Sequence, residues 1–208
     1  MVETIFFDFG GVFTYSPFTT IDELGVARGA AAGQFTEIIF GSYHADDDHP
    51  WHQLERGEIS MEDARQSILL RSRDAGLEID LYEVFGALPR DGGVRNRLIE
   101  KVASLKEAGF HLAIITNNVR EFSDGWRSLM PVDELFEEVI DSSFEGVRKP
   151  NPAIFELALQ RMNTRPESSL FLDDYPSNVA AAEALGIRSI LVDTDDDRVI
   201  SEIDSCLA

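Results

Sequence analysis

The sequence is almost without cysteine, since Cys206 is the only one among its 208 residues. A single thiol cannot form a disulfide within the chain, so a disulfide-stapled scaffold is excluded and a reducing compartment is expected. The position of Cys206 also argues against a catalytic thiol. No basic segment followed by an apolar one opens the chain, and no apolar run approaches the ~20 residues of a membrane-spanning helix. We therefore expect a cytoplasmic protein with no membrane partner.

Basic residues are also scarce. The chain has 18 lysines and arginines against 38 aspartates and glutamates, for a net charge of -20. Nucleic acids and anionic membrane surfaces attract basic patches, so neither is expected as a partner. A small anionic substrate remains compatible, because a local cationic pocket can form on an acidic protein. The length and the 44% hydrophobic content fit one core domain with a modest insertion.

Short apolar runs alternate along the chain with longer amphipathic stretches, and no internal repeat or Pro- or Ser-rich linker interrupts them. This alternation predicts right-handed crossovers and a doubly wound, Rossmann-like α/β core with a parallel sheet. In such sheets ligands bind beyond the carboxyl ends of the strands. The predicted strands are 4–7, 111–115, 138–141, 170–172 and 189–192, and the predicted helices are 93–108, 119–129, 152–162, 176–185 and 196–206.

Residues 16–90 depart from that alternation, having helical patterns and no convincing strand. Within them, "RGEIS" (56–60) is typical of a connector between two helices. Ser60 followed by Asp63 three residues later forms a capping-box pattern, which indicates a helix start. The expected organisation is therefore a core of residues 1–15 and 91–208, with a small helical cap of residues 16–90 inserted after the first strand.

Three acidic residues follow predicted buried strands. Asp8 lies in "IFFDF", and Asp173 and Asp174 end "LFLDD". Because the carboxyl ends of parallel strands meet at one sheet edge, these carboxylates should converge, with a repulsion on the order of 4 kcal/mol per close pair. A positive group must lie among them. Two candidates are expected together: Lys149, and a divalent cation, for which oxygen ligands on a loop suit Mg²⁺.

The stretch "ITNN" closes the second predicted core strand just before a predicted helix. Thr116 belongs to the same sheet edge as Asp8, and its hydroxyl with backbone N–H groups at a helix N-terminus could hold phosphate oxygens. A carboxylate nucleophile, a cation, a lysine and an anion-holding turn together suit phosphoryl transfer. The expected partner is a small phosphorylated metabolite.

Four motifs in order, "FFDFGGVFT", "IITNN", "GVRKPNPAIF" and "LFLDDYPSNVAAAEALGI", resemble those of the haloacid dehalogenase-like hydrolases. The likeness spans nearly the whole chain, and the text around "HPWHQLERGEIS" and "DFGGVF" is most similar to the N-terminal phosphatase domain of epoxide hydrolases and to bacterial sugar-phosphate phosphatases. The resemblance implies a phosphatase that forms an aspartyl-phosphate. By position it implies that Asp8 is the nucleophile and a metal ligand, and that Lys149 neutralises the reacting groups. It implies that Thr116 binds the phosphoryl group, with Asn117 and Gly11 at the substrate. Mg²⁺ would be held by Asp8, by Asp174, by the Gly10 carbonyl and, directly or through water, by Asp173.

One position departs from the family pattern. Most phosphatases of the family carry a second aspartate two residues after the nucleophile, which protonates the leaving alkoxide and later activates water, and here that residue is Gly10. Its main-chain carbonyl survives the substitution, so the metal site is kept while acid–base catalysis, typically worth ~10²–10⁴-fold, is in question. Substitute proton donors in the cap are His44, His49, His52 and Glu58; alternatively, the leaving group departs easily, as from a sugar-1-phosphate.

Other readings stay open from the sequence. A 2-haloacid dehalogenase would use the same nucleophile without metal and likewise lacks the second aspartate, whereas a binding or regulatory protein would keep the fold without turnover. Singly, Asp8 or the Asp173–Asp174 pair could also be loop acids that cap helices. The acidic pair favours the metal-dependent phosphatase, because it has a clear purpose only around a cation. The substrate and the oligomeric state are not specified.

Overall fold

The computed structural model of the protein describes residues 1–88 and 93–208. Its core is a five-stranded sheet in the order β3-β2-β1-β4-β5, and every neighbouring pair is parallel. This confirms the predicted doubly wound α/β architecture. Two of the predicted strands agree in both bounds and the others to within one or two residues. The strands are β1 (Thr4–Phe7), β2 (His111–Thr116), β3 (Glu138–Asp141), β4 (Ser169–Asp173) and β5 (Arg188–Leu191).

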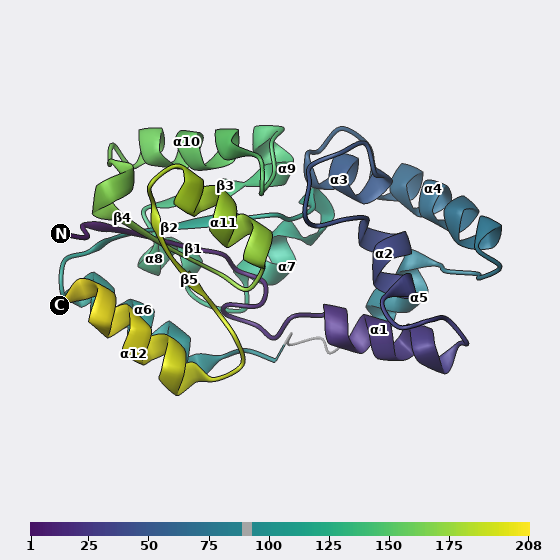
Figure 1. The fold of residues 1–208 in the computed structure, drawn as a ribbon, viewed down its shortest axis with the longest axis horizontal. Coiled ribbons are helices and arrows are strands. Elements are labelled where there is room, and N and C mark those ends of the chain that lie inside the picture. Colours follow the sequence, from purple (N-terminus) through teal and green to yellow (C-terminus); the bar gives the residue numbers. More distant parts are fainter. Residues whose placement is uncertain (89–92) are drawn as a thin grey trace.

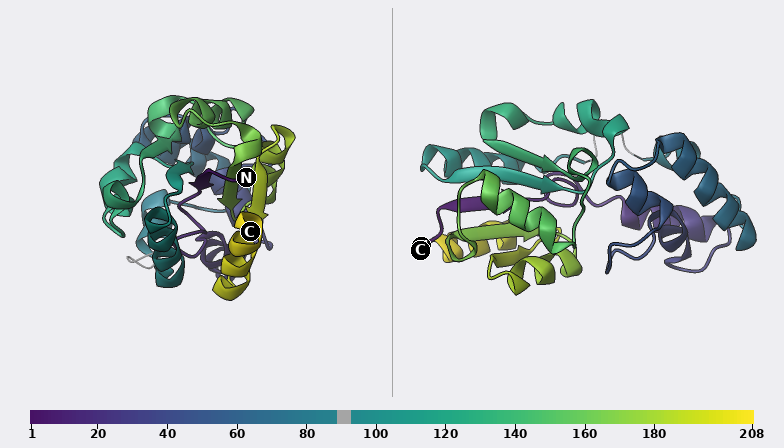
Figure 2. Two further views of the ribbon diagram at one scale, coloured as in Figure 1. Left: turned by 90° about the vertical axis from the view of Figure 1, so that its left-hand side faces the viewer. Right: turned by 90° about the horizontal axis from the view of Figure 1, so that it is seen from above.

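Helices cover both faces of the sheet, as Figure 1 and the end-on view in Figure 2 show. Successive residues of a strand point to opposite faces. Ile5 and Phe7 accordingly pack toward α6 (Asn96–Glu107) and α12 (Asp196–Leu207), whereas Phe6 packs toward α10 (Pro152–Arg161) and α11 (Pro176–Ala184). All three side chains are buried. Burial on both faces explains why the strand is a continuous apolar run rather than an alternating one.

The predicted helix at 119–129 is wrong in its extent. The chain instead forms a 3₁₀ turn, η1 (Arg120–Phe122), and a short helix, α7 (Ser123–Arg127). The N–H of Val119 donates to the Asn118 side chain, and the N–H of Phe122 donates to the Val119 carbonyl in the tighter 3₁₀ pattern. Three further short elements were not predicted: α8 (Val132–Leu135), α9 (Ser142–Glu145) and η2 (Pro166–Ser168).

The cap is helical, as predicted, and residues 16–88 contain no strand. Its helices surround a separate hydrophobic core that includes Ile21, Ile39 and Ile68. The connector and the capping box are confirmed, since the Ser60 side chain accepts from the N–H of Asp63 and the Asp63 side chain bonds back to the N–H of Ser60. The helices are α1 (Phe18–Ala27), α2 (Gln34–Phe40), α3 (Pro50–Glu55), α4 (Met61–Asp74) and α5 (Leu81–Gly86).

The cap lies beyond the carboxyl ends of the strands, while both chain termini lie at the opposite end of the core (Figure 1). Seen from above in Figure 2, the two parts form separate lobes joined at one junction. The predicted boundary at 15/16 falls just before α1, whereas the boundary at 90/91 lies outside the described residues. Among the helices that the structure describes, none has the length and apolar character that a bilayer crossing requires.

Candidate active site

Asp8 is held at the point where β1 ends. Its N–H donates to the carbonyl of Leu172 in the neighbouring strand β4 at 2.8 Å, which continues the sheet ladder by one residue. One carboxylate oxygen accepts from the N–H of Phe9 at 2.7 Å and lies 2.9 Å from the Lys149 ammonium. The side chain is 12% exposed, so it reaches the cavity that opens above the sheet edge without being free in solvent.

Lys149 bridges two of the three predicted acids. Its ammonium is buried and lies 2.9 Å from Asp8 and 2.6 Å from Asp173. Burial alone would lower the pKa of Lys149, but the charges of Asp173 and Asp8 raise it, so the ammonium stays charged at neutral pH. A positive charge is therefore fixed beside the predicted nucleophile, as the sequence led us to expect.

The two adjacent aspartates have different surroundings. The Asp173 carboxylate is fully buried and accepts from Lys149, from the N–H of Tyr175 at 2.8 Å and from the Asn178 amide at 3.0 and 3.1 Å. Asp174 lies in the cavity lining, with the Ser16 hydroxyl as its hydrogen-bonding neighbour. Asp173 is thus occupied in positioning Lys149, while Asp174 faces the cavity. Sequence reasoning missed Asn178, although it stands in the quoted fourth motif.

The carboxylates of Asp8, Asp173 and Asp174 offer oxygen atoms that all lie within 4.8 Å of one another. Burial raises the pKa of Asp8 to about 7, with Lys149 opposing the shift, and burial followed by repulsion from Asp173 raises the pKa of Asp174 to about 8. When ionised, three carboxylates around one ammonium have an excess of negative charge, which a divalent cation would neutralise. The oxygen donors and the charge fit Mg²⁺.

Two glycines follow Asp8, at positions 10 and 11, and differ in the side chains that their surroundings permit. Gly11 has a φ of +77°, and a Cβ there would lie 2.1 Å from the carboxyl carbon of Asp174, so a side chain would collide with a candidate metal ligand. Gly10 has no heavy atom within 4 Å of its ideal Cβ position and lies outside the left-handed region. The local backbone and packing require glycine at position 11, whereas position 10 would accommodate a side chain.

The "ITNN" residues divide into buried and lining groups. Thr116 is buried at the end of β2 and is outside the described cavity lining, whereas Asn117 and Asn118 line the cavity. The Asn117 side chain accepts from the N–H of Lys149 at 2.8 Å and donates to its carbonyl at 2.9 Å, so it fixes the lysine backbone. The N–H groups of Asn118 and Val119 already have side-chain acceptors. The expected phosphate cradle at a helix N-terminus is therefore not formed by these two groups.

The substitute proton donors expected in the cap do not line the described cavity. His49 and His52 are buried, and burial lowers the pKa of both, that of His49 to about 4. Glu58 forms an ion pair with Arg56, and the exposed His44 stacks near Tyr175 at a ring distance of 5.7 Å. The cap acid that does line the cavity is Glu55, the last residue of α3 and three residues before the glutamate that the sequence suggested.

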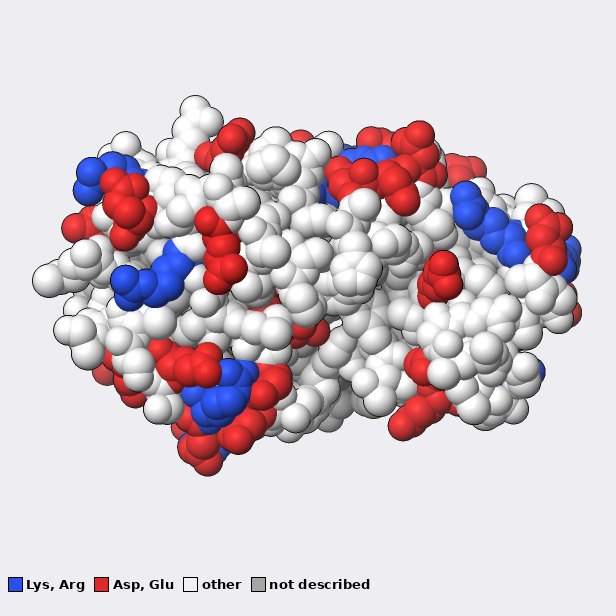
Figure 3. Space-filling model, in the orientation of Figure 1, with Lys and Arg blue, Asp and Glu red and all other residues white. Residues whose placement is uncertain are grey.

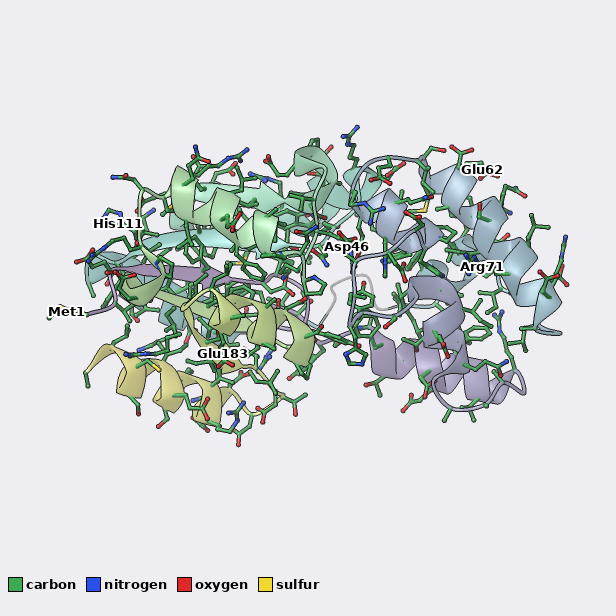
Figure 4. The ribbon with its side chains drawn as sticks, turned by 45° about the horizontal axis from the view of Figure 1, so that its top comes forward. Met1, Asp46, Glu62, Arg71, His111 and Glu183 are labelled. Carbon is green, nitrogen blue, oxygen red and sulfur yellow. The ribbon has the colours of Figure 1, made fainter. Side chains whose placement is uncertain are left out.

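Glu55 is the centre of a contact between cap and core that the sequence did not reveal. Its carboxylate is 2.7 Å from the guanidinium of Arg148, the residue directly before Lys149, and both side chains are buried. Arg148 also donates to the carbonyl of Ala45 at 3.1 Å and lies over the Tyr43 ring. Asp46, labelled at the junction in Figure 4, receives the Asn151 amide at 3.4 Å. The cap is thus anchored beside Lys149.

The sequence and structural likeness to known proteins agrees with this geometry. A family model described as haloacid dehalogenase-like hydrolase matches residues 2–186. The chain belongs to this family. The resemblance read from the four motifs is confirmed.

Three curated relatives show where this hydrolase fold occurs. The hydrolase is 31% identical to acyl-CoA dehydrogenase family member 10 of Mus musculus over 207 residues, which cover 98% of this chain and 19% of that protein. It is 27% identical to bifunctional epoxide hydrolase 2 of Rattus norvegicus over 155 residues, 69% of this chain and 28% of that protein. It is 36% identical to the glyceraldehyde 3-phosphate phosphatase of Pyrococcus abyssi over 109 residues, 51% of this chain and 43% of that protein. The chain spans less than half the length of each.

Solved structures show the same fold over nearly the whole chain. A HAD-like family hydrolase from Porphyromonas gingivalis superposes with a TM-score of 0.68 at 26% identity, covering 100% of this chain and 98% of the other. A HAD family enzyme from Bacteroides thetaiotaomicron, solved in complex with magnesium and inorganic phosphate, gives a TM-score of 0.64 at 19% identity and covers 91% and 93% of the two chains. The core with its cap is therefore a shared architecture of this family.

Proposed function

We propose that this hydrolase is a magnesium-dependent phosphatase of small phosphomonoesters, with sugar phosphates among the candidate substrates. The observation that carries the proposal is the placement of the Asp8 carboxylate, 2.9 Å from a buried ammonium and at one side of a cluster of three carboxylates at the cavity. The named activity of the Pyrococcus relative and the magnesium–phosphate complex of the Bacteroides neighbour support it.

In the proposed reaction an Asp8 oxygen attacks phosphorus, the P–O bond to the alcohol breaks, and an aspartyl-phosphate forms. Lys149 stabilises charge on the nucleophile and on the transferring phosphoryl group, since its ammonium is already fixed at Asp8. Water then hydrolyses the aspartyl-phosphate, which releases inorganic phosphate and restores the carboxylate. The bound cation would supply charge neutralisation, held by Asp8, Asp174 and the Gly10 carbonyl, with Asp173 binding directly or through water.

Proton transfer to the leaving alkoxide is the step that lacks its usual group, because Gly10 stands where most phosphatases of the family have the second aspartate. Tyr43 and Glu55 line the cavity, but they bond to each other, and burial together with the Glu55 charge raises the pKa of Tyr43 well above its usual value. The Tyr43 proton is thus engaged by Glu55, and the other Glu55 oxygen by Arg148, so neither group is arranged to protonate a leaving group. The reaction should consequently be fastest for alcohols that leave without protonation.

The test is a panel of phosphomonoesters assayed with Mg²⁺ and with chelator. We expect phosphate release with Mg²⁺, loss of release on chelation and full recovery when the metal is added back. Chloride release from 2-haloacids that chelator does not affect would replace this function with the metal-independent dehalogenase. Phosphate binding without turnover of any ester would favour a binding protein.

A further inference from the structure

A cavity of about 610 Å³ lies above Asp8, between the core and the cap. Its size falls in the usual range for small-molecule sites. At about 30 Å³ per water-sized group, it has room for on the order of 20 such groups. A phosphoryl group occupies only a small part of that space, so most of the cavity is available to the alcohol portion of the substrate.

The cap side of this cavity is a continuous aromatic wall. Phe18 contacts Tyr43 at a ring distance of 5.0 Å, Phe40 contacts Trp51 at 4.9 Å, and Trp51 contacts Phe85 at 5.5 Å. All five side chains line the cavity. The first two contacts are edge-to-face and the third is tilted, geometries that aromatic pairs prefer. The cap therefore presents a preformed apolar surface to whatever fills the site.

Away from the polar groups at the sheet edge, the core side of the cavity also carries apolar side chains. Its lining includes Phe9, Val119, Phe122, Trp126 and Leu129. Phe122 contacts Phe85 of the cap at 5.4 Å, so the two walls meet, and it remains 37% exposed. On the face shown in Figure 3, the junction of the two lobes is largely uncharged below the acidic group at its upper edge. An apolar ligand would remove exposed ring surface such as that of Phe122 from water.

The polar atoms on the cap wall are already bonded to one another. The indole N–H of Trp51 donates to Glu55 at 2.8 Å, the Tyr43 hydroxyl donates to Glu55 at 3.0 Å, and the second Glu55 oxygen accepts from Arg148 at 2.7 Å. A sugar that entered here would give up hydrogen bonds to water and find few partners in return. Thr14, Tyr15, Ser16, Thr20 and Tyr175 add single hydroxyl groups to the lining. Three amides near the sheet edge also line the cavity and already make bonds within the protein, those of Asn117, Asn118 and Asn178.

The charges of the cavity also restrict the substrate. Within the part of the lining that the structure describes, Lys149 is the only cation, and it is engaged by Asp8 and Asp173. The Glu55 charge is engaged by Arg148. A second anionic group on the substrate would have no such counter-charge on the described walls and would lose its hydration.

From these walls we propose that the substrates are phosphomonoesters of uncharged, apolar alcohols, hydrocarbon or aryl, rather than sugar phosphates or phosphorylated carboxylic acids. The inference rests on the proposed phosphatase function and specifies the leaving group of that site. It replaces the sugar phosphates suggested by the sequence with apolar esters, because the aromatic walls offer dispersion and burial rather than hydrogen bonds.

The test keeps leaving-group acidity nearly constant while it varies apolar area. Phosphate release is measured for the primary alkyl monophosphates from ethyl to octyl, below their micelle concentrations, and for a primary sugar 6-phosphate. We expect kcat/KM to rise with chain length by about two- to fourfold per methylene, up to the value for full burial. The octyl ester should exceed the sugar phosphate by more than tenfold, whereas equal rates for the sugar and octyl esters would overturn the inference.

A substitution in the cavity wall tests whether the dependence of kcat/KM on alkyl chain length arises in this cavity. Phe122→Ala removes a ring that is partly exposed, so the fold should tolerate it, and it should lower kcat/KM for octyl phosphate more than for ethyl phosphate, which flattens the chain-length dependence. Phe144→Ala is the matched control, because Phe144 is an exposed phenylalanine outside the described lining. Equal chain-length dependence in both variants would show that the alkyl chain binds elsewhere and would overturn the inference.

Binding of alkylphosphonates separates this inference from the phosphatase function. The carbon–phosphorus bond resists hydrolysis, so calorimetric titration of the Mg²⁺-loaded protein reports the pocket without turnover. Affinity that rises from ethyl- to octylphosphonate supports the apolar site even if no ester is hydrolysed, in which case the phosphatase function alone would fail. Affinity independent of chain length, with esters hydrolysed, would remove the inference and leave the phosphatase function intact.

Discussion

Glu55 of the cap and Arg148 of the core form an ion pair of 2.7 Å in which both side chains are buried. The pair joins the wall of the cavity to the residue beside Lys149, so it couples the cap to the chemistry below it. Breaking a buried pair by removing one partner leaves an uncompensated charge, which typically costs about 3–5 kcal/mol.

We expect Glu55→Ala to lower the free energy of unfolding by about 3–5 kcal/mol in urea denaturation, for the reason just given. It should also lower kcat/KM, since Arg148 no longer holds the cap at the site. The control is Glu78→Ala, which removes an exposed partner of Arg73 and should cost less than about 1 kcal/mol. Equal costs in the two variants would mean that the buried pair does not anchor the cap.

The second prediction concerns the nucleophile. Asp8→Asn keeps the shape of the side chain, so folding should be preserved, while phosphate release falls by a factor on the order of 10⁶, as for other enzymes that lose a nucleophile. The acid-stable, base-labile phosphoprotein expected from an aspartyl-phosphate should disappear with it. Rates within tenfold of the unmodified protein would exclude the covalent mechanism.

The third prediction concerns pH and metal together. In the unfolded chain Asp8 and Asp174 ionise near their ordinary pKa of 3.8, whereas in the metal-free fold their pKa values are raised to about 7 and about 8. The fold therefore binds more protons between these limits, and its stability should decrease as pH rises from about 4 to 8. Mg²⁺ needs the ionised carboxylates, so its stabilising effect should grow over the same range.

Thermal unfolding with and without Mg²⁺ at pH 6 and pH 8.5 checks this. At 100 times its dissociation constant, Mg²⁺ should stabilise the fold by about 2.7 kcal/mol, or about 5–10 °C in Tm for a chain of this size. The shift should be largest at pH 8.5 and absent in Asp174→Ala. Asp197→Ala, an exposed acid, serves as the control. A shift that is larger at pH 6 would contradict the assignment of these groups.

The two adjacent aspartates should respond differently to substitution. Asp174→Ala should weaken Mg²⁺ binding more than Asp173→Ala, because Asp174 faces the cavity. Asp173→Ala should instead be the more destabilising change, since it leaves Lys149 without one of its two anions and the Asn178 amide without its acceptor. Calorimetric Mg²⁺ titration and urea unfolding of both variants distinguish metal ligation from structural support. Identical profiles would disprove the division of roles.

The fifth prediction uses the open position at Gly10. Wild-type rates should fall steeply as the leaving-group pKa rises, because an unprotonated alkoxide must depart. Gly10→Asp has space around its Cβ and should flatten this slope, raising rates on alkyl esters by up to ~10²-fold, whereas Gly10→Ala should not. Gly11→Ala should lose Mg²⁺ binding through its clash with Asp174. A shallow wild-type slope that Gly10→Asp leaves unchanged would show that another group donates the proton.

Local pattern and sheet geometry were enough to predict the cluster of three acids at the sheet edge. The apolar run before Asp8 predicts β1 with its observed bounds, and parallel pairing with β4 brings Asp8 next to Asp173 whatever their separation along the chain. The extent of the helix predicted over 119–129 could not be obtained from pattern and sheet geometry. Its periodicity is helical, but its first turn closes in the tighter 3₁₀ pattern, with the N–H of Phe122 bonded to the Val119 carbonyl, and α7 ends at Arg127.

The cap contacts lay beyond sequence reasoning for a different reason. Glu55 and Arg148 are 93 residues apart, and no register links them as strand pairing links the core acids. The position of one lobe on the other depends on the shape of both surfaces, which no periodicity expresses. The glutamate suggested from the sequence, Glu58, lies in the connector after α3, three residues beyond Glu55, the one found in the cavity.

Both ends of the chain emerge from the face of the core farthest from the cap (Figure 1). A fluorescent protein, an affinity tag or a surface linker attached at Met1 or Ala208 would therefore extend away from the cap and from the cavity between cap and core. The molecule is thus well suited to assays in which it is immobilised through either end.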